Sequence, residues 1–133
     1  MNGITDLDEL LRSMSPKLQR GDFIFCSFAD ANYGDHAHLQ PVAAMQEEEG
    51  LTLVIPKELA DANNVPYESV FRCITLTVYS SLDAVGLTAA FSSQLAHHGI
   101  SANVVAGHHH DHLFVNSENA DDAMAALAEL ANN

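Results

Sequence analysis

Apolar residues recur at helical spacing or in short runs along most of the chain, which predicts an alternation of helices and strands. Near the N-terminus, one apolar face predicts a helix over residues 7–14 that ends before Pro16. A strand is predicted over residues 22–28, because apolar side chains on both faces are typical of an interior strand. Residues 29–41 are polar, and the pattern leaves a short helix there as one option.

A hairpin and a helix complete the first half of the chain. Residues 42–45 and 51–55 are the predicted strands of the hairpin, and the acidic residues 47–49 with Gly50 form its turn. A helix is predicted directly after it, over residues 57–63. The longest predicted strand follows at residues 71–79, where alternation makes one face more apolar than the other.

The second half begins with the clearest helical pattern of the sequence. We predict a helix with its N-cap among residues 80–83, with Gly86 inside it and with Gly99 just past its end. Its apolar face consists of Ala84, Leu87, Phe91 and Leu95. A hairpin over residues 100–115 follows, and Ser117 is the predicted N-cap of a last helix.

The two halves share this order of elements, which predicts an internal repeat. The segment GLTLVIPKELADA of the first half corresponds to DHLFVNSENADDA of the second, each a strand that runs into a helix. We therefore predict two modules, over residues 1–69 and 70–133. The first module has lost or shortened the helix that Leu87 and Phe91 anchor in the second.

Charge and cysteine content narrow the classes of partner. The chain has 18 acids against five bases, a net charge of -13, which disfavours binding to nucleic acid or to an anionic membrane. Cys26 and Cys73 are far apart in apolar runs and form no C-x-x-C pair, so we expect reduced thiols. With an acidic N-terminus and no apolar run of membrane-spanning length, the expected location is the cytoplasm.

The sequence contains no common catalytic signature. There is no G-x-S-x-G nucleophile turn and no G-x-x-x-x-G-K phosphate loop, and neither cysteine has a histidine partner in sequence. The acids fall at helix starts and hairpin tips, where capping and solvation account for them. We expect a protein that is not an enzyme and that carries no cofactor.

The best candidate for ligand binding is the turn that connects the strand at 71–79 to the following helix. Free N–H groups and the positive end of the helix dipole stabilise an anion there without a basic side chain. Gly86 would let a ligand approach the backbone; the alternative is that it only permits close packing of helix and strand. The candidate residues are Ser80, Ser81, Leu82, Asp83, Val85, Gly86 and Leu87.

Histidines form a second candidate cluster. His108, His110 and His112 are spaced two apart, so neighbouring pairs could share one side of a strand and chelate a transition metal. Protonation of several imidazoles near pH 6 would alternatively make the surface respond to pH. Solvated side chains in a hairpin turn are the third explanation.

The run ITLTVYSSLDAVGLTAAFSSQLAHHGISANVVAGHHHDHLFV resembles the core of an ACT domain, and EEEGLTLVIP matches the hairpin of a preceding module. The whole chain is similar to small stand-alone proteins with two ACT modules. The resemblance implies an α+β fold of two ferredoxin-like modules side by side, with antiparallel sheets covered by helices. Where the commoner family loop is D-x-P-G, this chain has Asp83, Ala84, Val85 and Gly86.

The same resemblance implies a regulatory function. In ACT domains the ligand lies between modules, held by the loop after the first strand and by a facing second strand, here represented by Ser101, Asn103 and Val104. We expect a sensor of an amino acid or similar small molecule, and a homodimer because open sheet edges tend to pair. The alternatives are a metal-binding or histidine-based pH-responsive module, and a protein-interaction module without a ligand.

Overall fold

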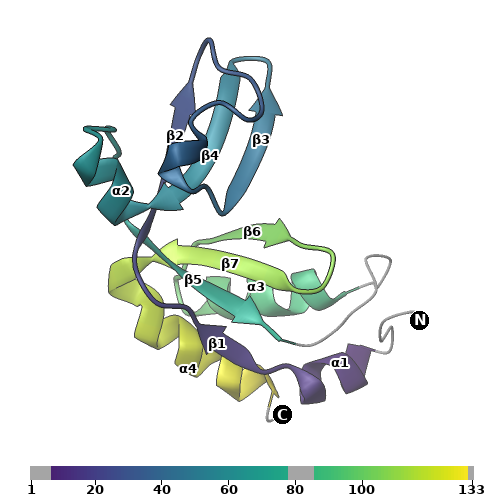
Figure 1. The fold of residues 1–133 in the computed structure, drawn as a ribbon. Helices are drawn as coiled ribbons and strands as arrows, with labels where there is room; N and C mark the ends of the chain where they lie inside the picture. The colour runs from purple at the N-terminus through teal and green to yellow at the C-terminus, as the bar shows by residue number, and fades with distance from the viewer. Residues whose placement is uncertain (1–6, 78–85, 132–133) are drawn as a thin grey trace. The chain divides into compact units, whose positions relative to one another are not determined.

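The computed structural model describes residues 7–77 and 86–131, and the chain divides into two compact units. The inserted unit is Arg20–Phe71. The terminal unit combines the chain up to Gln19 with the chain from Arg72 onward (Figure 1). The contacts therefore group the N-terminal helix with the C-terminal half, because its apolar face packs into that core. The boundary between the predicted repeat modules, 1–69 and 70–133, differs from the boundaries of these units and stays a prediction.

The inserted unit consists of antiparallel strands and one short helix. Its strands pair in the order β3-β4-β2, with Glu47 opposite Gly50 and Phe28 opposite Leu51. The elements are β2 (Phe23–Phe28), a 3-10 turn η1 (Ala37–Leu39), β3 (Ala43–Glu47), β4 (Gly50–Pro56) and α2 (Lys57–Ala62). The hairpin and the helix confirm the predicted elements, and the undecided segment 29–41 contains η1.

The terminal unit has a longer set of elements. Its strands follow the order β1-β5-β7-β6. The first residue of β5, Phe71, belongs to the inserted unit, where it pairs with Phe23 of β2. The elements are α1 (Leu7–Ser13), β1 (Pro16–Leu18), β5 (Phe71–Leu76), α3 (Leu87–His97), β6 (Ala102–Ala106), β7 (Asp111–Asn116), a 3-10 turn η2 (Ser117–Asn119) and α4 (Ala120–Ala131). Antiparallel strands with helices packed on them confirm the α+β class.

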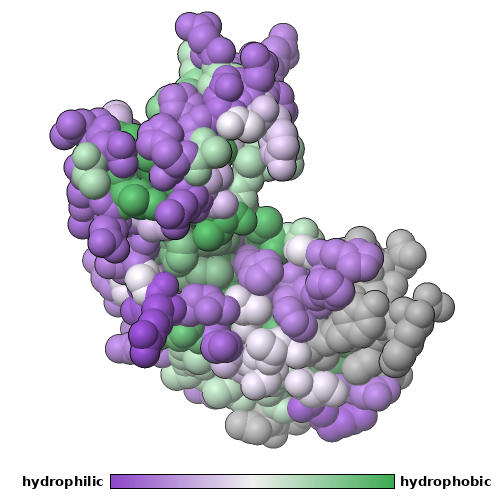
Figure 2. All heavy atoms as spheres, viewed as in Figure 1, coloured by the Kyte–Doolittle hydropathy of each residue, from purple (hydrophilic) through white to green (hydrophobic). Residues whose placement is uncertain are grey.

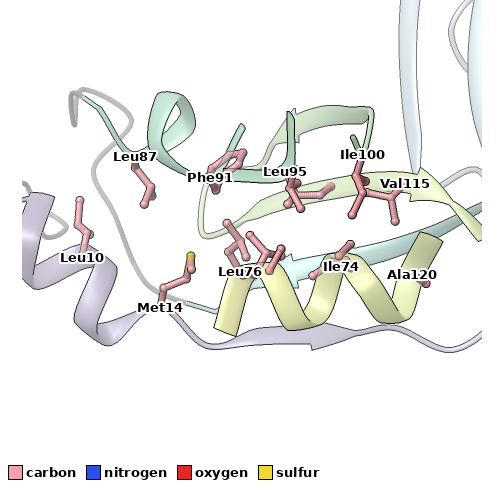
Figure 3. Close-up of a cluster of buried hydrophobic side chains, with 14 residues drawn as sticks. Leu10, Met14, Ile74, Leu76, Leu87, Phe91, Leu95, Ile100, Val115 and Ala120 are labelled. Carbon is pink, nitrogen blue, oxygen red and sulfur yellow. The ribbon is translucent and has the colours of Figure 1, made fainter. Parts of the chain in front are cut away.

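Alternation along the strands builds the core of the terminal unit. Ile74 and Leu76 of β5, with Leu113 and Val115 of β7, lie on the face that contacts the helices. The helices contribute Leu10 and Met14 of α1, Leu87, Phe91 and Leu95 of α3, and Leu127 of α4. Figure 3 shows these side chains gathered into one layer. The predicted apolar faces are confirmed for α1, for α4 and for Leu87, Phe91 and Leu95 of α3, whereas Ala84 lies outside the described residues.

The two ends of α3 show why glycines stand there. At the C-terminal end, the Ile100 N–H donates to the Leu95 carbonyl at 2.9 Å and the Gly99 N–H to the Ala96 carbonyl at 2.9 Å, a Schellman motif. Gly99 has φ +72°, as that motif requires. At the start, Gly86 is the N-cap residue with φ +97°. The prediction that Gly86 lies inside the helix is therefore wrong.

Two further details differ from the sequence prediction. Pro16 ends the first helix as expected, but it also begins β1, a three-residue strand that pairs with β5 and that is too short for a periodicity signal. Ser117 is not the N-cap of the last helix, because it is the first residue of the 3-10 turn η2, whose N-cap is Asn116. Among the described helices, none combines the length and hydrophobicity needed to cross a lipid bilayer.

Candidate functional site

The predicted ligand-binding turn is described only at its C-terminal end. Residues Ser80, Ser81, Leu82, Asp83 and Val85 lie outside the described residues. Gly86 and Leu87 are described, and they form the start of α3. The first hydrogen bond within the helix joins the Ala90 N–H to the Gly86 carbonyl at 2.9 Å. The N–H groups of the first turn therefore have no acceptor within the helix, which gives this end a positive partial charge.

Both the backbone conformation and the packing at position 86 favour glycine. A Cβ atom added to it would lie 3.1 Å from Leu7 Cδ2, and its φ of +97° disfavours any other residue. Leu87 is buried in the core, so its side chain anchors the helix. The packing interpretation of Gly86 is thus supported by contacts, and a larger residue at this position would disturb the fold before it reported on a ligand.

The other predicted binding residues are Asn103 and Val104 of strand β6 and Ser101, which directly precedes it. Asn103 Nδ2 donates to the Phe114 carbonyl of β7 at 3.3 Å, and the side chains of Ser101 and Val104 are exposed. Ser101 follows the C-cap of α3, whereas Gly86 is its N-cap, so the 11-residue helix separates them by roughly 16 Å. One copy of the terminal unit does not bring Ser101 and Gly86 together.

Of the three predicted histidines, His112 takes part in a chain of polar side chains that joins separate segments of the terminal unit. Thr75 is buried, and its Oγ1 accepts a hydrogen bond from Gln19 Nε2 at 3.0 Å and lies 2.9 Å from His112 Nδ1. The threonine hydroxyl can donate to His112 Nδ1 or accept from it, and the direction follows the tautomer of the imidazole. No group of three or more metal-ligating side chains occurs among residues 7–77 and 86–131.

Burial shifts the titration of two side chains in this hairpin. Burial, and then the neighbouring charge of His110, lowers the pKa of His112, although Asp111 acts against this shift. Burial raises the pKa of Asp111, although the two histidines beside it act in the opposite direction. Both shifts disfavour charge, so this part of the sheet favours a neutral His112.

A hollow in the inserted unit was not anticipated from the sequence. It has a volume of about 370 Å³ and lies between the 29–41 segment and the start of β3. Its lining consists of Tyr33, Gly34, Asp35, Ala37, Pro41, Val42, Ala43, Ala44 and Leu53. The available signal was the run of turn-forming residues directly after a strand; Gly34, His36 and Gln40 all adopt positive φ.

A second hollow, of about 340 Å³, lies at the end of β2 in the same unit. Phe28 and His36 line it, and their rings stack with centroids 3.8 Å apart and planes inclined by 18°. The 29–41 segment follows the first strand of the inserted unit, as residues 77–86 follow β5 in the terminal unit. Both hollows thus lie at the position in the inserted unit that matches the predicted binding turn.

Two family models, both described as ACT domain, match the chain over residues 2–72 and 68–129. The chain belongs to the ACT domain family. ACT domains are commonly regulatory modules that bind small molecules. The antiparallel sheets and packed helices of both units agree with the ferredoxin-like form of this family.

Solved structures support the same fold. A protein of unknown function from Vibrio cholerae, described as a possible transport protein, is 50% identical with a TM-score of 0.86, over 94% of this chain and 95% of that one. A protein from Agrobacterium tumefaciens is 19% identical, with a TM-score of 0.70 over 89% of each chain. The regulatory subunit of aspartate kinase from Thermus flavus is 10% identical, with a TM-score of 0.59 over 88% of this chain and 95% of that one. No protein with a curated description matches the chain.

Proposed function

We propose that this chain is a non-catalytic regulatory protein whose ACT modules bind an amino acid or a similar small carboxylate. The observation that carries the proposal is the pair of ACT domain matches, which together span residues 2–129. The likeness in fold to a regulatory subunit of aspartate kinase agrees with it. Binding would shift the association of the protein with itself or with a partner.

The proposed site combines the turn before α3 of one copy with strand β6 of a neighbouring copy. The positive end of α3 would stabilise the ligand carboxylate. Asn103 of β6 and Ser101, the residue directly before this strand, would supply polar contacts. Because the length of α3 separates Ser101 from Gly86 within one unit, a complete site needs two copies, and we propose a homodimer.

Two other features of the described residues agree with a protein of the cytoplasm, which is the proposed location. Cys26 and Cys73 are free thiols, and both have a raised pKa because burial disfavours the thiolate. Unpaired cysteines of this kind are typical of reducing compartments.

The test is a thermal-shift panel of the common L-amino acids at millimolar concentration. A ligand present at one hundred times its dissociation constant stabilises the native state by about 2.7 kcal/mol, which is a measurable rise in Tm. We expect one chemical class of amino acid to raise Tm and Ser81→Ala to reduce the rise. Ser93→Ala makes the same change on the exposed side of α3 and is the matched control.

Sedimentation velocity with and without that amino acid tests the site between copies. The proposal predicts a dimer whose association tightens with ligand. A monomer at saturating ligand would contradict the shared site, and an unchanged Tm with every amino acid would contradict the ligand class.

A further inference from the structure

Strand β3 is an edge strand with backbone groups directed away from the sheet. In the described strand order it neighbours β4 alone. Glu47 and Gly50 flank the two-residue turn at 48–49, so they form a hydrogen-bonded pair. Along antiparallel strands, hydrogen-bonded pairs alternate with pairs that are not hydrogen-bonded to each other. Ala43, Met45 and Glu47 therefore bond to β4, whereas Ala44 and Gln46 direct their N–H and C=O groups outward.

Large apolar side chains flank this edge on both faces. Tyr33 is 81% exposed, Val42 56% and Met45 63%, and these are the three most exposed large apolar residues in the described chain. Tyr33, Val42 and Ala44 line the 370 Å³ hollow, which lies on the face of Leu53. Met45 pairs with Thr52 and so lies on the opposite face. An added strand would place alternate side chains in the hollow and against Met45.

Charge identifies the kind of segment that fits. Glu47, Glu48 and Glu49 are all exposed at the C-terminal end of β3, and Figure 2 shows hydrophilic residues gathered at the end of the inserted unit where β3 turns into β4. The bases of the inserted unit are Arg20 and Lys57, and Lys57 forms an ion pair with Asp61 at 2.9 Å. The acidic end of β3 attracts a basic segment electrostatically, whereas it would repel a second copy of this acidic chain.

We propose that the β3 edge binds an extended segment of a partner protein, which adds to the sheet antiparallel to β3. The segment has lysine or arginine at its N-terminal end, beside Glu47 and Glu48, followed by alternating apolar residues. Backbone hydrogen bonds to Ala44 and Gln46 supply affinity, and the hollow and Met45 select the apolar side chains. This interaction is separate from the proposed amino-acid site and does not depend on it.

The test uses the full chain and a fluorescent peptide, Lys-Lys-Val-Thr-Val-Thr-Val, with fluorescence anisotropy as the readout. We expect saturable binding that weakens as salt is added. The reversed peptide, Val-Thr-Val-Thr-Val-Lys-Lys, has the same composition and places its charge at the wrong end, so we expect about tenfold weaker binding. Methylating the valine amides that face β3 removes backbone donors and should weaken binding by a similar factor.

A protein variant tests the edge directly. Ala44→Pro removes an outward N–H without removing a bond to β4, so the fold tolerates it and binding falls by about tenfold. Ala44→Thr keeps the N–H and is the matched control. Absent binding at millimolar peptide, equal binding of the reversed peptide, or equal binding of the methylated peptide overturns the proposal. A wild-type dimer that Ala44→Pro alone dissociates also overturns it, because a second copy would then occupy the edge.

Discussion

The inserted and terminal units follow the same order of elements but cover their sheets to different extents. In the terminal unit, β5 leads to the 11-residue helix α3 and the β6-β7 hairpin leads to the 12-residue helix α4. In the inserted unit, the corresponding positions hold a three-residue 3-10 turn and the six-residue helix α2. Fourteen buried residues form the described core of the terminal unit, against seven in the inserted unit.

The two units therefore differ in the surface that they offer to a partner. A sheet face covered by two long helices buries its apolar side chains and is available mainly at its edges and helix ends. The shorter elements of the inserted unit leave Tyr33, Val42 and Met45 exposed beside an open strand edge. We infer that the terminal unit supplies most of the stability, whereas the inserted unit carries the more open surface.

The largest expected effect comes from a cavity in the terminal core. Phe91 is fully buried between α1, α4 and the sheet, so Phe91→Ala should reduce the free energy of unfolding by about 3–5 kcal/mol. Urea denaturation followed by circular dichroism measures this loss. A change below about 1 kcal/mol would show that the terminal core does not control stability.

A matched cavity in the inserted unit should have a smaller and more local effect. Leu53 is buried but borders the hollow, so Leu53→Ala should cost about 2 kcal/mol, at the low end for such changes. Amide hydrogen exchange should then accelerate in β2, β3 and β4 while α3 and α4 stay protected. Equal acceleration in α3 and α4 would mean that the two units unfold together.

Substitutions at two glycines of positive φ distinguish the cost of backbone strain from the cost of a steric contact in the terminal unit. Gly86→Ala and Gly99→Ala both place a side chain at left-handed φ, which costs about 1–2 kcal/mol. A Cβ atom on Gly86 also meets Leu7 at 3.1 Å, whereas one on Gly99 has nothing within 4 Å. Thermal unfolding should therefore show a larger loss for Gly86→Ala. Equal losses would remove the role assigned to Leu7.

The smallest expected effect is a pH dependence of the terminal unit. The pKa of His112 is lowered in the folded state, so below its unfolded value of 6.5 the unfolded chain binds more protons. Stability is therefore fully present above pH 6.5 and falls as the pH drops toward the lowered folded pKa. His112→Gln should flatten this part of the stability profile, measured by urea denaturation between pH 5 and 8; His97→Gln controls for the loss of one histidine. An unchanged profile would contradict the burial assigned to His112.

Sequence patterns predicted the elements that rest on long apolar periodicity. The faces of α1, α3 and α4, the hairpin at 42–55 and the hairpin at 100–115 all follow from spacing, because burial of one face dominates their energetics. The ferredoxin-like form came from the resemblance to ACT domains. Strand β1 was missed because three residues carry no period, and only the folded chain brings Pro16 beside Leu76.

The contacts of the candidate site could not be predicted from apolar spacing. Gly86 was recognised as important, but its reason, a left-handed N-cap against Leu7, depends on a contact between residues 79 positions apart. The chain from Gln19 through Thr75 to His112 likewise joins three separate segments. The hollow beside Tyr33 arises from irregular backbone, which apolar periodicity does not describe.

Two-dimensional 15N–1H NMR titration with L-amino acids tests the proposed site at the start of α3, because it reports binding and its location together. We expect saturable shifts of the amide signals of residues 80–87 and 101–104, with the signals of β3 and its turn unchanged. Shifts confined to the inserted unit, or no saturable shift with any amino acid, would contradict an amino-acid sensor built on the start of α3.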